Sequence, residues 1–281
     1  MGTPIVRALS NRFPVFAFDT DPRRQSAVPG GLWAASMKNL AAVADVVVTV
    51  LPGPGELHEC MTEAIPALRP GTLWLDLTSG DPEVTRQLAE EAQHHDVEAV
   101  AAPMGGSVAE AAAGDLVFFV SGTDAAVARA HPILEVLSGP GGVRRAGARV
   151  EDGQIVKLLA NGLWFANAVA ASEAMLIGQG LGLAPGDLHE LLRDSAGGSR
   201  FLEEHAGRLL NGDYLATFRF DRVVEELDTI TAMGVAAQVS TPVLDTSARL
   251  HHTALERFGP ALGELLAVKM LEEEARRRLR R

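Results

Sequence analysis

Cysteine is nearly absent from the sequence, since Cys60 is the only one in 281 residues. A single cysteine excludes an intrachain disulfide and a cysteine metal cluster, and such usage is typical of a reducing cytoplasm. Cys60 stands in PGELHECMTEAIPAL, whose pattern predicts an amphipathic helix in which a lone cysteine packs as a small hydrophobic residue. The eight histidines lack metal-ligand spacing within one element. We therefore expect a cytoplasmic protein without a metal site.

Positive charge is scarce as well. The chain has 25 Lys and Arg residues against 36 Asp and Glu residues, and its net charge of −11 opposes binding to nucleic acid or to an anionic membrane surface. We expect no membrane span and no signal peptide, because no apolar run approaches the necessary length and the N-terminus lacks a basic-then-apolar pattern. With 47% hydrophobic residues, the chain can bury a large core. These properties favour a soluble globular protein that binds neither nucleic acid nor an anionic membrane.

Short apolar runs alternate with helical patterns over the first half of the chain. Such alternation is typical of a parallel sheet covered by helices on both faces. The predicted strands are residues 15–18, 46–51, 73–77, 97–101 and 116–120, and the predicted helices between or after them are residues 39–44, 56–68, 82–94 and 124–137. The glycine-rich segment SGPGGVRRAGA is interpreted as a break before a last short strand.

Signals for β-structure nearly vanish after about residue 151. The segment EDGQIVKLLANGLWFANAVAASEAMLIGQGLGL is long and apolar around much of its circumference, which predicts a helix buried between domains or subunits. The remaining sequence is typical of helices joined by short loops. We therefore predict a Rossmann-like, doubly wound α/β domain over residues 1–147, followed by an all-helical domain over residues 148–281.

The first residues, MGTPIVRALSNRFPVFAFDTDP, match the second half of a βαβ unit: a short amphipathic helix leads into a predicted strand that ends at Asp19. In a dinucleotide-binding unit, a strand and a glycine turn precede this helix, and an acid at the tip of the second strand binds the adenosine ribose. Gly2 stands where the third glycine of the turn belongs, and Asp19 where the acid belongs. For this stretch by itself, the favoured alternative is that Gly2 has no special role and Asp19 is a turn residue.

Five segments, in order, resemble motifs of the β-hydroxyacid dehydrogenase family, which includes 3-hydroxyisobutyrate dehydrogenases and semialdehyde reductases. They are MGTPIVRAL, VTVLPGPGEL, LDLTSGDPEVTRQLAE, APMGGSVAEAAAGDLVFFVSG, and GQIVKLLAN followed by ASEAMLIGQGLGL. The resemblance covers essentially the whole chain and implies an NAD(P)-dependent oxidoreductase that assembles as a homodimer or homotetramer. It also implies that Leu51 and Pro52 line the nucleotide and that Thr78 lies near the nicotinamide. Members of the family begin with a strand and a G-x-G turn, so the resemblance further implies that these precede Met1.

The last of these segments contains Lys157, which the resemblance implies to be the catalytic lysine. Lys157 and Asn161 are four residues apart, so a helix would project both from one face toward the same substrate oxygen. A lysine in a nearly continuous apolar helix is suited to exchange a proton with a hydroxyl while hydride moves to the nicotinamide. Apart from the family pattern, the alternative is a lysine that snorkels to solvent at the start of a helix.

The resemblance implies a substrate loop formed by Met104, Gly105, Gly106 and Ser107. This loop follows a predicted strand end, where open α/β sheets bind ligands, and its glycines would let backbone N–H groups approach a carboxylate. The family usually has Ser-Gly-Gly here, so in this chain the hydroxyl is displaced or lost. A flexible crossing turn would explain the glycines equally well.

A second departure from the family lies in DRVVEELDT. Many relatives have Lys-Asp here, whereas this chain has Glu225 and Glu226, and acids near the substrate would disfavour the carboxylate of the usual 3-hydroxy acids. Arg222 or Arg200 could supply the missing charge, or either could be a solvated helix residue. The identity of the substrate therefore stays open.

The residues after the predicted strand over residues 15–18 bear on the choice of cofactor. Asp19 can accept hydrogen bonds from a ribose diol but repels a 2′-phosphate, and Thr20 stands where NADP-using relatives often have arginine. These residues favour NAD. Arg23 and Arg24 follow closely, so NADP stays possible.

Three functions follow from these patterns. The first is an NAD(P)-dependent dehydrogenase of the 3-hydroxyisobutyrate type, with Lys157 as general acid/base. The second is a related reductase of C=N bonds, a family that often replaces the lysine by another proton donor, so Lys157 counts against it. The third is a nucleotide-binding but catalytically silent relative, which Gly105 and Glu225 would suit.

Overall fold

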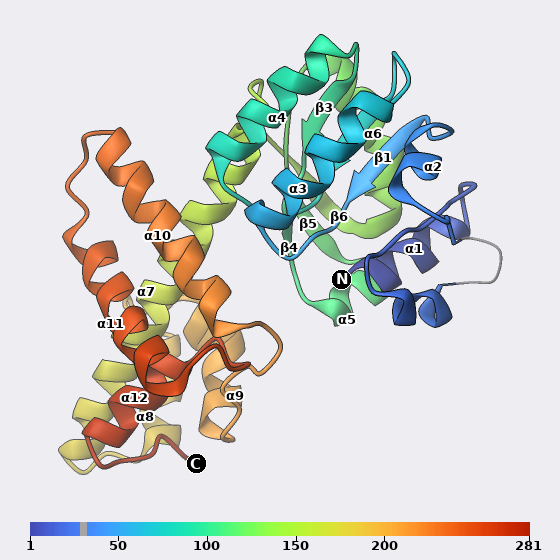
Figure 1. Ribbon diagram of the computed structural model, residues 1–281. Helices are drawn as coiled ribbons and strands as arrows, with labels where there is room; N and C mark the ends of the chain where they lie inside the picture. Colours follow the sequence, from blue (N-terminus) through green and yellow to red (C-terminus); the bar gives the residue numbers. More distant parts are fainter. Residues whose placement is uncertain (29–32) are drawn as a thin grey trace. The chain divides into compact units, whose positions relative to one another are not determined.

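The computed structural model describes residues 1–28 and 33–281, which form two compact units, Met1–Lys157 and Leu158–Arg281 (Figure 1). The division falls inside the longest helix, α7 (Asp152–Gly180). The predicted domain border, near residue 147, coincides with the end of the last strand of unit 1, β6 (Ser138–Gly147). Each unit has hydrophobic cores of its own, and we describe the units separately.

Unit 1 contains a six-stranded sheet in which β5 pairs with β3, β4 and β6. The other strands are β1 (Val46–Thr49), β2 (Leu73–Asp76), β3 (Glu98–Ala101), β4 (Met104–Gly105) and β5 (Leu116–Ser121). β1, β2 and β3 are parallel neighbours, but β5 runs antiparallel to β3 and β4. The sheet is therefore mixed rather than all parallel. The reversal occurs at the short helix α5 (Val108–Ala113), which ends at Gly114 with a φ of 70°.

Alternation along β2 separates two cores. Leu73 and Leu75 point to one face of the sheet, whereas Trp74, 1% exposed, points to the other. Helices pack on both faces (Figure 1). The first core contains residues of α1 (Gly2–Ser10), α5 and α6 (Asp124–Leu137), and the second contains residues of α2 (Met37–Ala41), α3 (Pro54–Ala64) and α4 (Pro82–His94). The predicted doubly wound arrangement is confirmed.

Two segments of unit 1 differ from the prediction. Residues 15–18 do not form a strand: among the described residues, Ala17 alone of the four is paired, in a single bridge to Trp33, and Phe16 is 55% exposed. An extended segment without a continuous partner has no ladder of hydrogen bonds. Conversely, the glycine-rich segment is itself β6, beside β5. Its glycines permit this close pairing, since a Cβ at Gly142 would lie 2.5 Å from the carbonyl oxygen of Leu116.

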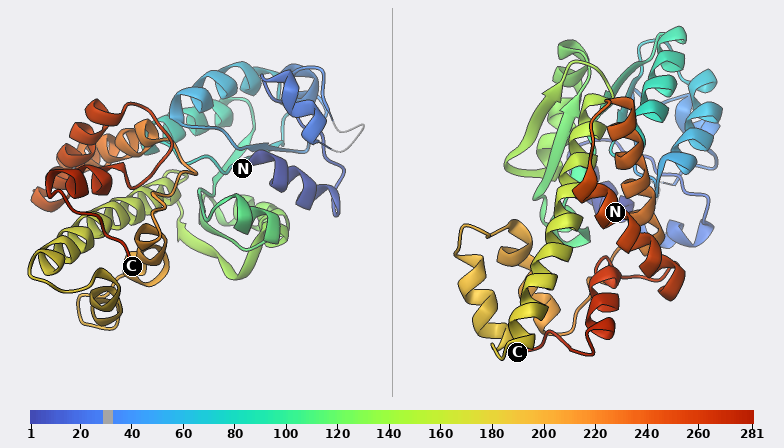
Figure 2. Two further views of the ribbon diagram at one scale, coloured as in Figure 1. Left: turned by 90° about the horizontal axis from the view of Figure 1, so that it is seen from below. Right: turned by 90° about the vertical axis from the view of Figure 1, so that its left-hand side faces the viewer.

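Unit 2 contains helices packed around α7 (Figure 2). Met175 and Leu176 of α7 pack in one core, and Phe165 and Val169 in another. The core around Met175 also contains residues of the π-helical turn η3 (Phe201–His205) and of α9 (Ala206–Leu210), and α8 (Pro185–Arg193) packs against it. Most of the core around Phe165 comes from α10 (Phe220–Ala236), α11 (Pro242–Phe258) and α12 (Leu266–Glu274). The predicted all-helical second half is confirmed.

By length and composition alone, α7 could cross a membrane, which the sequence analysis did not expect. The helix has 29 residues, and its most apolar window has a mean hydropathy of 1.3. One such helix is weak evidence, because a core helix of a soluble protein passes the same test. Residues of α7 belong to two hydrophobic cores, as expected for a helix at the centre of a bundle.

Candidate active site

The loops that follow β1 and β2 lie together at the carboxyl edge of the parallel strands. Leu51 donates its backbone N–H to Oγ1 of Thr78 at 3.1 Å, so these two predicted cofactor residues are neighbours. Thr78 is buried, Leu51 is half-buried, and Pro52 is exposed. The predicted nucleotide-binding residues of these loops are therefore brought to one edge of the sheet, where open α/β sheets bind ligands.

Beneath these loops lies a buried carboxylate that the sequence analysis did not single out. Asp76, 1% exposed, accepts hydrogen bonds from the Thr49 hydroxyl at 2.7 Å and from the Thr78 backbone N–H at 3.0 Å. Burial raises the pKa of Asp76 to about 6, and these hydrogen bonds oppose the rise. Trp74 donates its indole N–H to Thr49 at 3.0 Å, which orients the hydroxyl.

Gln154, fully buried in the first turn of α7, links this network to the helix that carries Lys157. Its Nε2 donates to the carbonyl oxygen of Thr78 at 2.8 Å and to Oδ2 of Asp76 at 3.3 Å, and its Oε1 accepts the N–H of Gly80 at 3.0 Å. Sequence reasoning missed Gln154, because its partners are more than 70 residues away and no local pattern marks them.

A second contact holds the same end of α7. Gly153 donates its N–H to the hydroxyl of Ser121 in β5 at 2.8 Å, and that hydroxyl donates to the carbonyl oxygen of Val150 at 2.6 Å. A Cβ at Gly153 would lie 2.3 Å from the carbonyl oxygen of Phe119, so a side chain there would push the helix away from the sheet. The start of α7 is therefore fixed by its backbone as well as by Gln154.

The predicted substrate loop forms a strand and a helix cap. Met104 and Gly105 form β4, and Gly106 follows with a φ of 121°, a conformation that favours glycine. Ser107 is exposed and caps α5: its Oγ accepts the N–H of Ala109 at 3.1 Å and also bonds to Glu110. The Ser107 hydroxyl, displaced relative to the family pattern, is thus engaged in a capping box.

The two predicted catalytic residues lie on α7, which continues as one helix through both. Lys157 is half-buried at the end of unit 1 and Asn161 is half-buried at the start of unit 2. Asn161 donates its side-chain N–H to Oε2 of Glu226 in α10 at 2.7 Å. This charge-assisted hydrogen bond fixes the amide of Asn161.

The other charged residues singled out near DRVVEELDT form ion pairs. Arg222 bonds to Glu225 at 2.7 Å within α10, and Arg200 bonds to Glu204 at 2.6 Å. The structure therefore separates the two acids that replace the family's Lys-Asp pair. Glu226 contacts Asn161, whereas Glu225 is compensated by an arginine on its own helix.

The predicted adenosine-binding residues lie near the N-terminus, at the start of unit 1. Gly2 begins α1, whose N-cap makes no side-chain hydrogen bond, so N–H groups of its first turn could bind phosphate. Asp19 and Thr20 are exposed, and Asp19 accepts the N–H of Asp21 at 2.9 Å. Arg23 bonds to Asp21 at 2.8 Å, and Arg24 lies 3.9 Å from it. An uncapped helix start and an exposed acid fit the phosphates and ribose of a dinucleotide.

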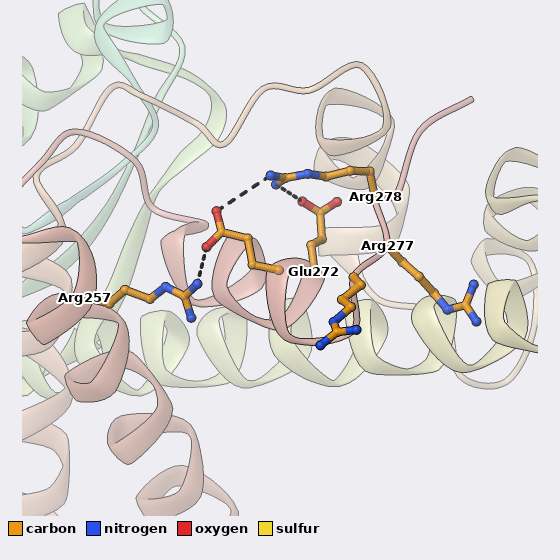
Figure 3. Close-up of a pocket in the computed structure, with 6 residues that line it drawn as sticks. Arg257, Glu272, Arg277 and Arg278 are labelled. Atoms are coloured by element: carbon orange, nitrogen blue, oxygen red, sulfur yellow. Dashed lines mark hydrogen bonds and ion pairs between the residues drawn. The ribbon is translucent and has the colours of Figure 1, made fainter.

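Unit 2 has a pocket of about 400 Å³, and none of the predicted site residues lines it (Figure 3). Arginines and glutamates line it, and Arg278 bridges Glu272 at 3.4 Å and Glu273 at 3.7 Å. Glu272 is fully buried and also accepts the N–H of Leu279 at 2.7 Å. The pocket therefore surrounds an internal ion-pair network of the C-terminal segment. In the described residues, no group of three His, Cys, Asp or Glu side chains could hold a metal ion.

Comparison with known proteins agrees with this architecture. Residues 1–147 match the family described as the NAD binding domain of 6-phosphogluconate dehydrogenase, and residues 152–271 match the NAD-binding family of NADP-dependent 3-hydroxyisobutyrate dehydrogenase. A probable 3-hydroxyisobutyrate dehydrogenase of Mycobacterium tuberculosis is 31% identical over 70% of this chain and 67% of its own length. The 2-(hydroxymethyl)glutarate dehydrogenase of Eubacterium barkeri is 28% identical over 86% of this chain and 82% of its own.

Solved structures share the fold over nearly the whole chain. The 3-hydroxyisobutyrate dehydrogenase of Mycobacterium tuberculosis, solved with L-serine, has a TM-score of 0.86 and 24% identity, covering 96% of this chain and 95% of its own. A Streptomyces aurantiacus imine reductase is more distant, with a TM-score of 0.59 and 18% identity over 96% of this chain and 95% of its own. The family matches, the relatives and the order of the motifs together show that this chain belongs to the β-hydroxyacid dehydrogenase family.

Proposed function

We propose that the protein is an NAD(P)-dependent dehydrogenase that oxidises the hydroxyl of a small hydroxy acid, or reduces the matching semialdehyde, with Lys157 as general acid/base. The observation that carries the proposal is the placement of Lys157. It follows Gln154 by one turn of α7, and Gln154 is bonded to the loop after β2 at the carboxyl edge of the sheet. Relatives are named 2-(hydroxymethyl)glutarate dehydrogenase and probable 3-hydroxyisobutyrate dehydrogenase, which supports the same reaction class.

When bound by unit 1, a nicotinamide cofactor would supply the hydride acceptor for oxidation and the hydride donor for reduction. The amine of Lys157 would accept the proton of the substrate hydroxyl in oxidation and return it in reduction. Asn161, held by Glu226 at 2.7 Å, would orient the same oxygen. The backbone N–H of Gly106, which follows the ladder between β4 and β5, would receive the substrate carboxylate.

Six residues of unit 1 would hold the cofactor: Gly2, Asp19, Thr20, Leu51, Pro52 and Thr78. We propose NAD as the preferred form, because Asp19 repels a 2′-phosphate. Arg23 and Arg24, the two residues that kept NADP possible, both face Asp21. Both arginine side chains are exposed and these surface pairs are weak, so NADP stays possible.

The test is the variant Lys157→Ala, assayed on a panel of hydroxy acids, aldehydes and cyclic imines with NAD(H) and NADP(H). Turnover should fall by about 10²–10⁴-fold, the usual loss of a general acid/base, while NADH binding measured by fluorescence stays near wild type. Lys38→Ala, an exposed lysine in α2, is the matched control and should retain turnover. More than about a tenth of wild-type activity in Lys157→Ala would refute the assignment.

The same panel decides between the alternatives. Turnover of cyclic imines without turnover of hydroxy acids would favour the imine reductase. NADH binding without turnover of any compound would favour the silent relative.

We further propose a cytoplasmic homodimer or homotetramer. One face of α7 within unit 2 is apolar and open: Leu159, Leu163 and Ile177 are 45%, 61% and 65% exposed. An exposed apolar stripe of this length is typical of an interface between subunits. Light scattering at micromolar concentration should give at least twice the chain mass, and a monomeric mass would contradict the proposal.

A further inference from the structure

Gln154 uses its whole amide in contacts with one loop. Both Nε2 hydrogens are donated, to Thr78 and to Asp76, and Oε1 accepts the N–H of Gly80. A methionine would match the length but could make none of these bonds, and a glutamate could accept but not donate unless protonated. The site therefore requires both halves of a glutamine amide.

This contact determines where the first turns of α7 lie relative to the sheet. Gln154 and Lys157 are three residues apart, so they project from neighbouring positions on the helix, about 4.5 Å apart along its axis. Gln154 bonds to the loop after β2, and Thr78 of the same loop accepts the N–H of Leu51. A single set of hydrogen bonds thus connects the loops at the sheet edge to the helix turn that carries Lys157.

A contribution to stability does not by itself explain the hydrogen bonds among Gln154, Asp76 and Thr78. Burial opposes ionisation of Asp76 and raises its pKa to about 6, and replacement of buried polar groups by apolar ones of the same shape is often nearly neutral. Its hydrogen bonds have fixed directions, which apolar packing lacks. The Gly153–Ser121 contact holds the same helix end independently, so loss of Gln154 should leave the fold intact.

We propose that Gln154, held by Asp76, is a positioning residue that sets the place of the Lys157 amine at the sheet edge. The inference rests on the proposed function and deepens it. A displacement of about 1 Å at a reacting group can cost 10²-fold in rate, so a small shift or rotation of this turn would be felt in the chemical step.

The experiment compares Gln154→Met and Gln154→Glu with Gln179→Met as the matched control. Gln179 lies near the other end of α7 and donates to the carbonyl oxygen of Arg278 at 2.9 Å, so its replacement removes a glutamine hydrogen bond of the same helix far from Lys157. Gln154→Met should lower kcat by about ten- to a hundredfold with unchanged NADH binding. Gln179→Met should keep kcat even where it lowers the melting temperature.

The pH dependence separates positioning from general loosening. In Gln154→Glu, protonation of the introduced carboxyl restores one donor, so kcat relative to wild type should rise as the pH falls. In Gln154→Met, the same ratio should stay flat. Equal pH dependence in both variants, or a kcat of Gln154→Met within about twofold of wild type, would overturn the inference.

A readout that needs no substrate uses the three lysines of the chain, Lys38, Lys157 and Lys269. Their reaction with acetic anhydride can be followed by mass spectrometry, and Lys38 and Lys269 serve as internal references. Gln154→Met should speed labelling of Lys157 relative to both, and an unchanged ratio would overturn the inference. If Lys157→Ala keeps its turnover, the proposed function falls; if only the Gln154 variants behave as wild type, this inference alone falls.

Discussion

His251 in α11 should make unit 2 lose stability in mild acid. The ring is 2% exposed, stacks on Phe220 with centroids 5.7 Å apart, and lies 5.6 Å from the ring of Phe165. Its Nδ1 lies 2.7 Å from the carbonyl oxygen of Ser247, which fits a neutral ring that donates from Nδ1. Burial lowers the pKa of His251 from 6.5 to about 4.

The size and sign of the effect follow from this difference. Above pH 6.5 the imidazole is neutral in the folded and unfolded chains and contributes no pH dependence. Between pH 6.5 and 4, the unfolded chain binds a proton that the folded chain does not, so the free energy of unfolding falls with the pH. At 1.36 kcal/mol per pH unit, the full loss is about 3 kcal/mol.

The assay is urea unfolding of wild type and His251→Phe at pH 7 and pH 4. Phenylalanine keeps the aromatic packing but cannot titrate, so this variant should lose about 3 kcal/mol less than wild type over the same range. Equal pH dependence in wild type and His251→Phe would refute the reasoning.

Two further predictions concern unit 1. Burial raises the pKa of Asp76 from 3.8 to about 6, so the stability that the protonated carboxyl contributes is present below pH 3.8 and is lost as the pH rises to 6. Asp76→Asn cannot titrate, so it should remove about 3 kcal/mol of this pH dependence, measured by urea unfolding. The same pH dependence in wild type and Asp76→Asn would contradict the prediction. Ser107→Ala removes a helix cap and should lower the free energy of unfolding by about 1 kcal/mol with kcat unchanged, whereas a large loss of kcat would show that the hydroxyl contacts the substrate.

The elements best predicted from the sequence carry their own start signals. The helices over residues 82–94 and 124–137 match α4 and α6, where Asp81 and Thr123 cap the first turns. The predictions failed where pairing with a neighbouring strand decides whether a segment forms a strand. Residues 15–18 have strand-like composition but no continuous neighbour, and the glycines of β6 were interpreted as a break because a close neighbouring strand leaves no trace in local sequence.

Some contacts of the candidate site could likewise be expected from the sequence, and others could not. Leu51 and Thr78 were assigned to the cofactor through the family resemblance, and they are neighbours in the structure because the ends of parallel strands meet at one edge of a sheet. The partnership of Asp76 with Gln154 joins residues 78 positions apart, and the pairing of Asn161 with Glu226 joins residues 65 apart. Such contacts depend on packing that periodicity and spacing do not encode.

The fully buried Glu272 has a practical consequence for handling the protein. Its carboxylate is neutralised from the last residues of the chain, by Arg278 and Arg280 and by the N–H of Leu279, whose side chain is itself fully buried. Proteolytic trimming before Leu279 would therefore take Arg280 and the Leu279 N–H away from this buried carboxylate and leave an apolar hole beside α9. An affinity tag is accordingly safer when it extends the chain beyond Arg281 than when it replaces these residues.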